Sequence, residues 1–164
     1  MATLRPMTLA EIEEFRTGHI DEYIRGRVDA GESPETAHRI ALAQHEEFYP
    51  GGLPAPGHHH YRVIEDSTPV GSLWLGTAPG DKPSQEWVFL VEIDEAHRGK
   101  GHGRAAMLLA EEEARRHGAK ELGLNVWGPN KVARSLYESL GYQTSSIQML
   151  KPLLSPEQPE PTAT

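Results

Sequence analysis

Three consecutive stretches of strand-like sequence in the middle of the chain set the strongest limit on its fold. Residues 59–66 alternate apolar and polar side chains, and residues 69–76 follow after a short Ser-Thr-Pro turn. Residues 86–93 contain the apolar run Trp-Val-Phe-Leu-Val. Strands separated by so few residues usually pair as antiparallel neighbours. We therefore expect an antiparallel meander at the centre of the fold.

Helical patterns lie on both sides of this meander. Thr8 and Glu11 form a capping-box pattern, which predicts a helix to about residue 29, and Ser33 and Pro34 begin a second helix. The remaining elements are a strand at 2–6, a helix at about 101–117, a strand at 120–126, a helix at about 129–140 and a last strand at 142–150. This order predicts an α/β domain with a mixed, mostly antiparallel sheet and about four helices.

The apolar positions of the third helix follow helical spacing. We expect its buried face to consist of Ala106, Met107, Ala110 and Ala114. The length of 164 residues suits one domain at 1–151, and the Pro-rich tail at 152–164 is expected to be disordered.

The composition excludes several classes of function. No apolar run approaches the roughly 20 residues that span a bilayer, and the first residues lack the apolar core of a signal peptide. The absence of Cys excludes disulfides and thiolate catalysis. A net charge of −8 disfavours binding to nucleic acid or anionic membranes and suits a cationic substrate such as an amine. We expect a cytoplasmic protein with neither nucleic acid nor membrane as a partner.

A glycine-rich turn, Arg98-Gly99-Lys100-Gly101-His102-Gly103-Arg104, follows the meander and precedes a helix. Glycine permits positive φ angles, so several amide N–H groups can converge at the helix N-terminus, where the helix dipole favours an anion. No Ser or Thr follows the Lys as in a P-loop, and the spacing differs from the dinucleotide fingerprint. We interpret the turn as a diphosphate site, with an ordinary tight turn as the alternative.

A second motif follows the next strand. From Asn130 to Tyr142 the chain contains the pattern Asn…Ala…Leu-Tyr-Glu…Gly-Tyr. This motif and the stretch from Val91 to Gly103 together resemble the two core motifs of the GNAT superfamily of N-acetyltransferases. The resemblance covers about residues 2–151, although the two early helices match only in architecture. It implies a sheet with splayed central strands and the transfer of an acetyl group from acetyl-CoA to an amine.

The resemblance also implies roles for individual residues. The turn at 98–104 would bind the pyrophosphate of coenzyme A, and the main chain of Val91 and Ile93 would bind its pantetheine amides. Main-chain N–H groups of that strand would also stabilise the oxyanion. Asn130 would contact the pantetheine arm. Tyr137 matches the tyrosine near the thioester sulfur, where it would protonate the departing thiolate.

The motifs leave the general base open. Some relatives carry Glu at the position of Asn125, but an amide cannot act as a base. We take Glu92, the nearest strand carboxylate, as the predicted base, with Glu86 as a further candidate. A water relay without a dedicated base is an equal alternative.

His58, His59 and His60 raise the question of a metal site. Adjacent residues of a strand face opposite sides, so at most two of them can converge on one ion. No carboxylate cluster lies at a recognisable ligand spacing around them, and we therefore expect no metal.

The expected acceptor is the amine of a small molecule. A protein Lys or N-terminal amine is the first alternative, and a non-catalytic acyl-CoA-binding module is the second. Trp74, Trp87 and Trp127 are candidates for lining the acceptor pocket, although such residues are often ordinary core or edge residues. Many members of the family are homodimers, so a homodimer is considered as well.

Overall fold

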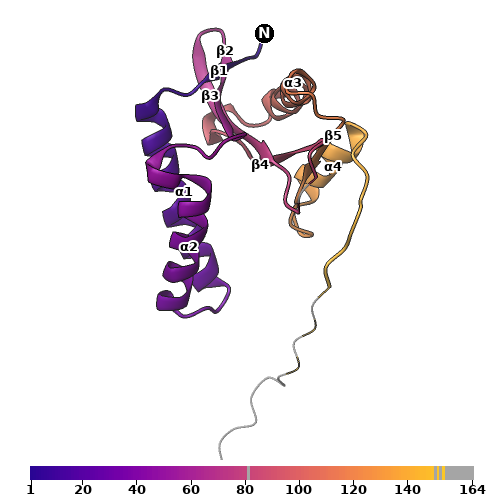
Figure 1. Ribbon diagram of the computed structural model, residues 1–164. Coiled ribbons are helices and arrows are strands. Elements are labelled where there is room, and N and C mark those ends of the chain that lie inside the picture. Colours follow the sequence, from indigo (N-terminus) through magenta and orange to yellow (C-terminus); the bar gives the residue numbers. More distant parts are fainter. Residues whose placement is uncertain (81, 150, 152, 154–164) are drawn as a thin grey trace, which may run out of the picture. The chain divides into compact units, whose positions relative to one another are not determined.

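The computed structural model describes residues 1–80, 82–149, 151 and 153 (Figure 1). The chain divides into two compact units, Met1–Asn125 and Val126–Thr164. Nearly all of the tail at 152–164, which we expect to be disordered, lies outside the described residues. Within the described part, every helix is too short or too polar to cross a bilayer.

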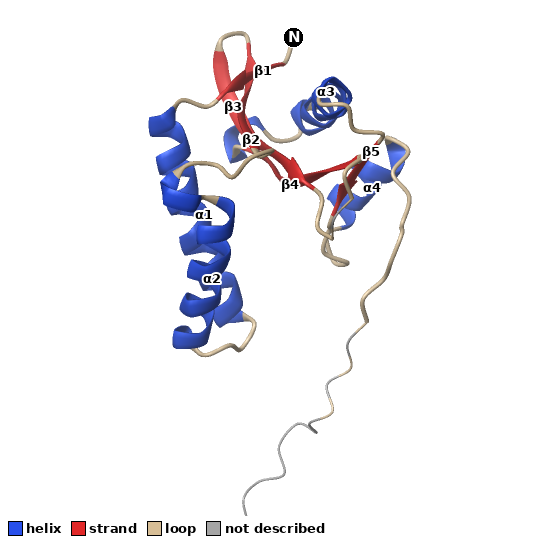
Figure 2. Cartoon of the chain, in the orientation of Figure 1, coloured by secondary structure: helices blue, strands red, loops and turns tan. Residues whose placement is uncertain are grey.

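A five-stranded sheet is the main feature of the first unit (Figure 2). Its strands, in order across the sheet, are β1 (Thr3–Pro6), β2 (His59–Glu65), β3 (Thr68–Thr77), β4 (Gln85–Ile93) and β5 (Glu121–Leu124). The first four strands are antiparallel neighbours, and β5 is parallel to β4. The predicted meander is therefore confirmed.

The helices begin close to where the capping patterns predict. They are α1 (Leu9–Asp29), α2 (Pro34–Phe48), α3 (His102–Arg116) and α4 (Lys131–Ser139), with short 3-10 turns at Pro50–Gly52 and Glu95–His97. The Thr8 hydroxyl accepts from the Glu11 amide while the Glu11 carboxylate accepts from the Thr8 amide. The Ser33 hydroxyl likewise accepts from the Thr36 amide. Each cap satisfies an amide that has no acceptor within its helix.

The first unit buries both faces of its sheet. On one face the ring of Trp74 makes edge-on contacts with Phe15 of α1 and Phe48 of α2. Leu73 and Leu75 lie on either side of Trp74 in β3, so their side chains point to the opposite face, against which α3 packs. The predicted stripe of α3 is confirmed, since its four residues are at most 3% exposed.

The last predicted strand is absent from the described residues. Residues 142–149 form no strand, and residue 150 lies outside the described part of the chain. Ile147 and Met149 are 77% and 87% exposed, so this segment buries neither of its apolar side chains. Alternating sequence indicates which face of a strand would be buried, but a strand also needs a neighbour for its backbone groups.

Gly71 marks a point where β3 and β4 approach too closely for a side chain. A Cβ atom at this position would lie 2.2 Å from the Glu92 carbonyl oxygen and 2.9 Å from Ile93 Cδ1. Because the first contact is with backbone, β4 would have to move. We expect Gly71→Ala to lower the free energy of unfolding by about 1–3 kcal/mol, as overpacking does elsewhere.

Urea denaturation measures this effect. Gly18→Ala is the matched control, because Gly18 lies inside α1 and a Cβ atom there meets nothing within 4 Å. That change should raise the free energy of unfolding by about 0.5–1 kcal/mol through helix propensity. Equal effects of the two substitutions would contradict the close approach at Gly71.

Candidate active site

The predicted anion-binding turn joins β4 to α3 in the first unit (Figure 1). Gly99 and Gly101 have φ angles of 75° and 85°, a conformation that favours glycine. Gly101 is the N-cap of α3, and its carbonyl oxygen accepts from the Ala105 amide at 3.1 Å. The amides of the first helical turn lie ahead of this bond and have no acceptor within the helix. A Cβ atom on either glycine would meet nothing within 4 Å. The turn therefore offers open amide donors, which fit a pyrophosphate.

The basic side chains of this turn contact the chain itself. Arg98 Nε donates to the Ile93 carbonyl oxygen at 2.8 Å, and Lys100 Nζ donates to the Ala96 carbonyl oxygen at 3.0 Å. His102 lies with its Nδ1 atom 4.0 Å from the Glu65 carboxylate, and its side chain is 13% exposed. These bonds hold the Arg98 side chain against the end of β4 and the Lys100 side chain against the 3-10 turn at Glu95–His97, so both charges stay beside the glycine-rich turn.

The second half of β4 has an edge that no described strand covers. β5 pairs with β4 only from Gln85 to Val88, whereas β3 pairs with β4 as far as Ile93. The Asp94 amide donates to Val70 on the β3 side at 2.9 Å. Amides alternate in direction along a strand, so the N–H groups of Val91 and Ile93 point to the other edge. β4 and β5 therefore stop pairing after Val88, as expected for splayed central strands. The predicted main-chain donors, the N–H groups of Val91 and Ile93, face the unpaired edge of β4.

A pocket of about 390 Å³ lies between the first two helices and the strands β3 and β4. Its aromatic lining residues are Tyr23, Phe48, Tyr49, Trp74, Trp87 and Phe89. The rings of Trp74 and Phe89 stack at 4.8 Å, and the Trp74 indole N–H donates to His58 Nδ1 at 3.0 Å. Two of the three predicted tryptophans therefore line the pocket, whereas Trp127 is 81% exposed in the second unit.

The polar side chains of the pocket include His19, Gln44, His45 and Asn125. Burial lowers the pKa of His19, and burial together with the Arg16 guanidinium lowers the pKa of His45. Both imidazoles are therefore neutral at pH 7 and can accept a proton. Neither histidine is predicted as a site residue from the sequence, because His19 fits the apolar face of α1 and His45 has no motif around it. The one available sign in the sequence was that His19, a titratable residue, lies among the apolar positions of its helix.

Neither predicted carboxylate lines this pocket. The Glu92 side chain is 54% exposed and lies 3.8 Å from the Arg98 guanidinium. Glu86 is 6% exposed and bonds to His117 Nδ1 at 2.9 Å. Glu86 precedes Trp87 in β4, and Trp87 lines the pocket, so the Glu86 carboxylate points to the opposite face of the sheet. The structure therefore brings His19, His45 and Asn125 to the pocket in place of these carboxylates.

The second unit contains the other two predicted site residues. Asn130 is the N-cap of α4, where its Oδ1 atom accepts from the Ala133 amide at 3.1 Å. Tyr137 is half-buried within α4, and its ring lies 5.9 Å from that of Tyr142. Burial raises the pKa of the Tyr137 phenol, so its hydroxyl keeps its proton at neutral pH. Tyr137 thus meets the first requirement of a general acid.

Comparison with known proteins decides the family. The family described as "Acetyltransferase (GNAT) family" matches residues 19–142, which include both motifs in full. The chain belongs to the GNAT family of acetyltransferases. This acetyltransferase is 30% identical over 152 residues to YycN of Bacillus subtilis (strain 168), which is described as an uncharacterized N-acetyltransferase. The alignment covers 92% of this chain and 97% of YycN. The enzyme class expected from the motifs, an acyltransferase, is confirmed.

Solved structures support the same fold. The crystal structure of YycN from Bacillus subtilis matches this GNAT acetyltransferase with a TM-score of 0.81 and 30% identity, over 94% of this chain and 100% of YycN. The aminoglycoside N-acetyltransferase AAC(6')-Iy, solved with a bisubstrate analogue, matches with a TM-score of 0.59 over 94% of this chain and 99% of its own. At 14% identity, that second likeness concerns the fold alone.

Proposed function

We propose that this acetyltransferase transfers an acetyl group from acetyl-CoA to the primary amine of a small molecule. The pocket between α1, α2 and β4 carries this proposal. Its volume of about 390 Å³ lies in the range of small-molecule sites, roughly 300–1,000 Å³. It is lined in part by Trp87, Val88 and Phe89, which directly precede the open edge of β4. An amine in this pocket would approach that edge.

The cofactor part of the proposal rests on the turn and on β4. Acetyl-CoA, when bound, supplies the acetyl group as an activated thioester. The amides of the turn at 98–104 would bind its pyrophosphate. The N–H groups of Val91 and Ile93 would bind the pantetheine amides and stabilise negative charge on the reacting carbonyl oxygen. Asn130 would contact the pantetheine arm through its amide nitrogen, since its oxygen caps α4.

Two proton transfers complete the proposal. The amine must lose a proton to become a nucleophile, and the neutral imidazoles of His19 and His45 are acceptors in the pocket. Glu92 stays the candidate carboxylate base, acting through a water relay because it does not line the pocket. Tyr137 would donate a proton to the thiolate, for which its raised pKa suits it.

The acceptor class is inferred from the lining of the pocket. Six aromatic rings favour an amine attached to an apolar or aromatic body, and they attract its cationic form through cation–π interactions. The net charge of −8 also suits a cationic amine and disfavours binding to nucleic acid or anionic membranes. A cytoplasmic location stays a prediction. A homodimer stays a prediction from the family.

A thiol-release assay with acetyl-CoA tests the proposed function. The panel should contain aryl-alkyl amines, linear polyamines, aminoglycosides, and peptides with a Lys or a free N-terminus. We expect the highest kcat/KM for small amines with an apolar body. Preference for peptides would favour a protein acetyltransferase. Tight binding of coenzyme A without turnover of any amine would favour a non-catalytic module.

Trp87→Ala should selectively weaken binding of the amine. Removing the indole opens the pocket and deletes a cation–π partner, so we expect KM for the best amine to rise roughly tenfold, about 1.4 kcal/mol. The dissociation constant of coenzyme A, measured by calorimetry, should not change. Trp127→Ala is the matched control, since Trp127 is 81% exposed and does not line the pocket. Equal kinetic effects of the two changes would remove the pocket from the acceptor site.

A further inference from the structure

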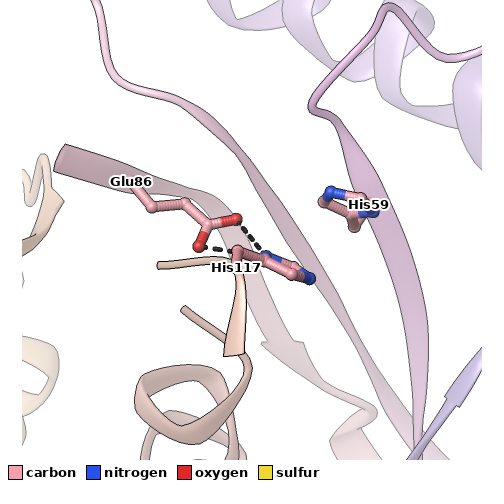
Figure 3. A group of neighbouring side chains, drawn as sticks. All are labelled: His59, Glu86 and His117. Carbon is pink, nitrogen blue, oxygen red and sulfur yellow. Dashed lines mark hydrogen bonds and ion pairs between the residues drawn. The ribbon is translucent and has the colours of Figure 1, made fainter. Parts of the chain in front are cut away.

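A second cluster of titratable side chains lies on the face of the sheet opposite the pocket. His59 belongs to β2, Glu86 to β4, and His117 is the C-cap of α3. One potential ligand atom from each residue lies within 4.8 Å of the other two. Figure 3 shows the three side chains and the two bonds, 2.9 and 3.2 Å long, between the Glu86 carboxylate and His117 Nδ1. The imidazoles of His59 and His117 stack with ring centroids 4.2 Å apart.

The acetyl-transfer site does not explain this cluster. None of its three residues lines the pocket or belongs to the glycine-rich turn. His60, the neighbour of His59, contacts Phe15 and Trp74 on the helical face with the pocket, so His59 must point to the other face. A carboxylate that is only 6% exposed, as Glu86 is, requires compensation of its charge. In this structure the bond from His117 supplies it, and a bound cation would do so as well.

We propose that His59, Glu86 and His117 bind a divalent transition-metal ion, for which Zn²⁺ is the best match. Two imidazoles and one carboxylate form a donor set typical of zinc, whereas Mg²⁺ and Ca²⁺ prefer oxygen ligands. Donor atoms around a tetrahedral zinc ion lie about 3.3 Å apart. In this structure the three donor atoms lie within 4.8 Å of one another, so binding an ion would require the side chains to rotate, including the stacked rings of His59 and His117.

A neighbouring carboxylate strengthens this assignment. Glu113 Oε2 lies 4.0 Å from the Nε2 atom of His117, which is the ring nitrogen that faces away from Glu86. Histidine ligands commonly bind the metal through one nitrogen and donate the other N–H to a carboxylate, which fixes the tautomer. Glu113 is one turn before His117 in the same helix and is placed to accept such a bond. The cluster therefore contains three ligands and a residue that orients one of them.

The ion would join elements that are distant in the sequence. It would connect β2, β4 and the C-terminal end of α3, and it would bind the folded chain but not the unfolded one. Such binding raises the free energy of unfolding by an amount that grows with the free metal concentration. We therefore assign the site a stabilising role.

Calorimetric titration of the full, chelator-treated chain with ZnCl₂ tests the proposal. We expect one equivalent to bind and the melting temperature to rise. His59→Ala, Glu86→Gln and His117→Ala should each weaken binding at least about tenfold, the lower end of losses seen for changes around metal ligands. His38→Ala is the matched control, because His38 is an exposed histidine of α2 outside the cluster, and it should leave the affinity unchanged. Zinc binding that His38→Ala weakens as much as the three ligand changes would overturn the site.

Co²⁺ supplies a test that needs no variant. Bound to the wild-type chain at the proposed site, it should give the intense visible absorption of a low-coordinate cobalt ion, and Zn²⁺ should displace it. The weak absorption of a six-coordinate aqueous ion, or the absence of any saturable binding, would overturn the proposal even if the variants fail to fold.

Discussion

Gly101→Glu should abolish measurable binding of acetyl-CoA while the protein stays folded. Gly101 has a φ angle of 85° and caps α3, so its replacement puts a carboxylate beside the amides that are expected to bind the pyrophosphate. An anion at that place competes with the ligand for the same positive potential. We expect the dissociation constant to rise at least about a hundredfold, or about 2.7 kcal/mol. Isothermal titration calorimetry with coenzyme A measures it.

A control variant is needed because Gly101→Glu has two effects: it adds a negative charge at the turn, and it strains the backbone at a positive φ angle. Any non-glycine residue at a positive φ costs roughly 1–2 kcal/mol. Gly118→Glu carries the same strain and the same charge, because Gly118 has a φ angle of 88° and open space around it, but it lies just beyond the opposite end of α3. It should lower the free energy of unfolding similarly and leave coenzyme A binding intact. Unchanged affinity in Gly101→Glu would refute the assignment of the turn.

Tyr137→Phe should lower kcat by a factor of roughly 10²–10⁴, the usual contribution of a general acid. The change removes only the hydroxyl that is expected to protonate the thiolate, so the affinity for coenzyme A should hardly change. Burial raises the pKa of Tyr137 above its ordinary value of about 10. The Tyr137 hydroxyl can donate a proton only while the phenol is un-ionised. The wild-type rate should therefore persist as the pH rises through about 10, the ordinary pKa of tyrosine. Steady-state kinetics across the alkaline range test both statements.

Tyr142→Phe is the matched control for this variant. The ring centroids of Tyr142 and Tyr137 lie 5.9 Å apart, and each Tyr→Phe substitution removes one hydroxyl oxygen. We expect its kcat to stay close to that of the wild type. A loss of coenzyme A affinity as large as the loss of kcat in Tyr137→Phe would instead indicate a binding role. Full activity of Tyr137→Phe would exclude it as the proton donor.

Local signals predicted much of the fold. The capping patterns at Thr8 and Ser33 located the starts of two helices, because a cap depends on residues only three positions apart. The small-residue stripe of α3 and the alternation of β2 and β3 depend on similarly short spacing. The two sequence motifs at 91–103 and 130–142 indicated the family on their own. Such features are contained in segments short enough to be identified without knowledge of their neighbours.

Features that depend on distant partners were predicted less well. The sequence predicted a strand at 142–150, yet residues 142–149 form none, because alternation cannot supply a backbone partner. Arg98 and Lys100 stay predicted residues of the phosphate-binding turn, and only the structure shows that both side chains also donate to carbonyl oxygens of the preceding segment. Glu92 stays the predicted carboxylate base, and only the structure shows that His19 and His45 line the pocket.

By itself, therefore, the sequence determined the order of the elements as far as α4, the glycine-rich turn and the enzyme family. Only the tertiary structure decided which side chains share a pocket and which carboxylate is buried beside two histidines. The physical reason is that the glycines of the turn adopt their conformation through local sterics, whereas the His59, Glu86 and His117 cluster exists only because β2, β4 and α3 pack together. Periodicity shows that a residue faces the core, but packing decides which residues it meets there.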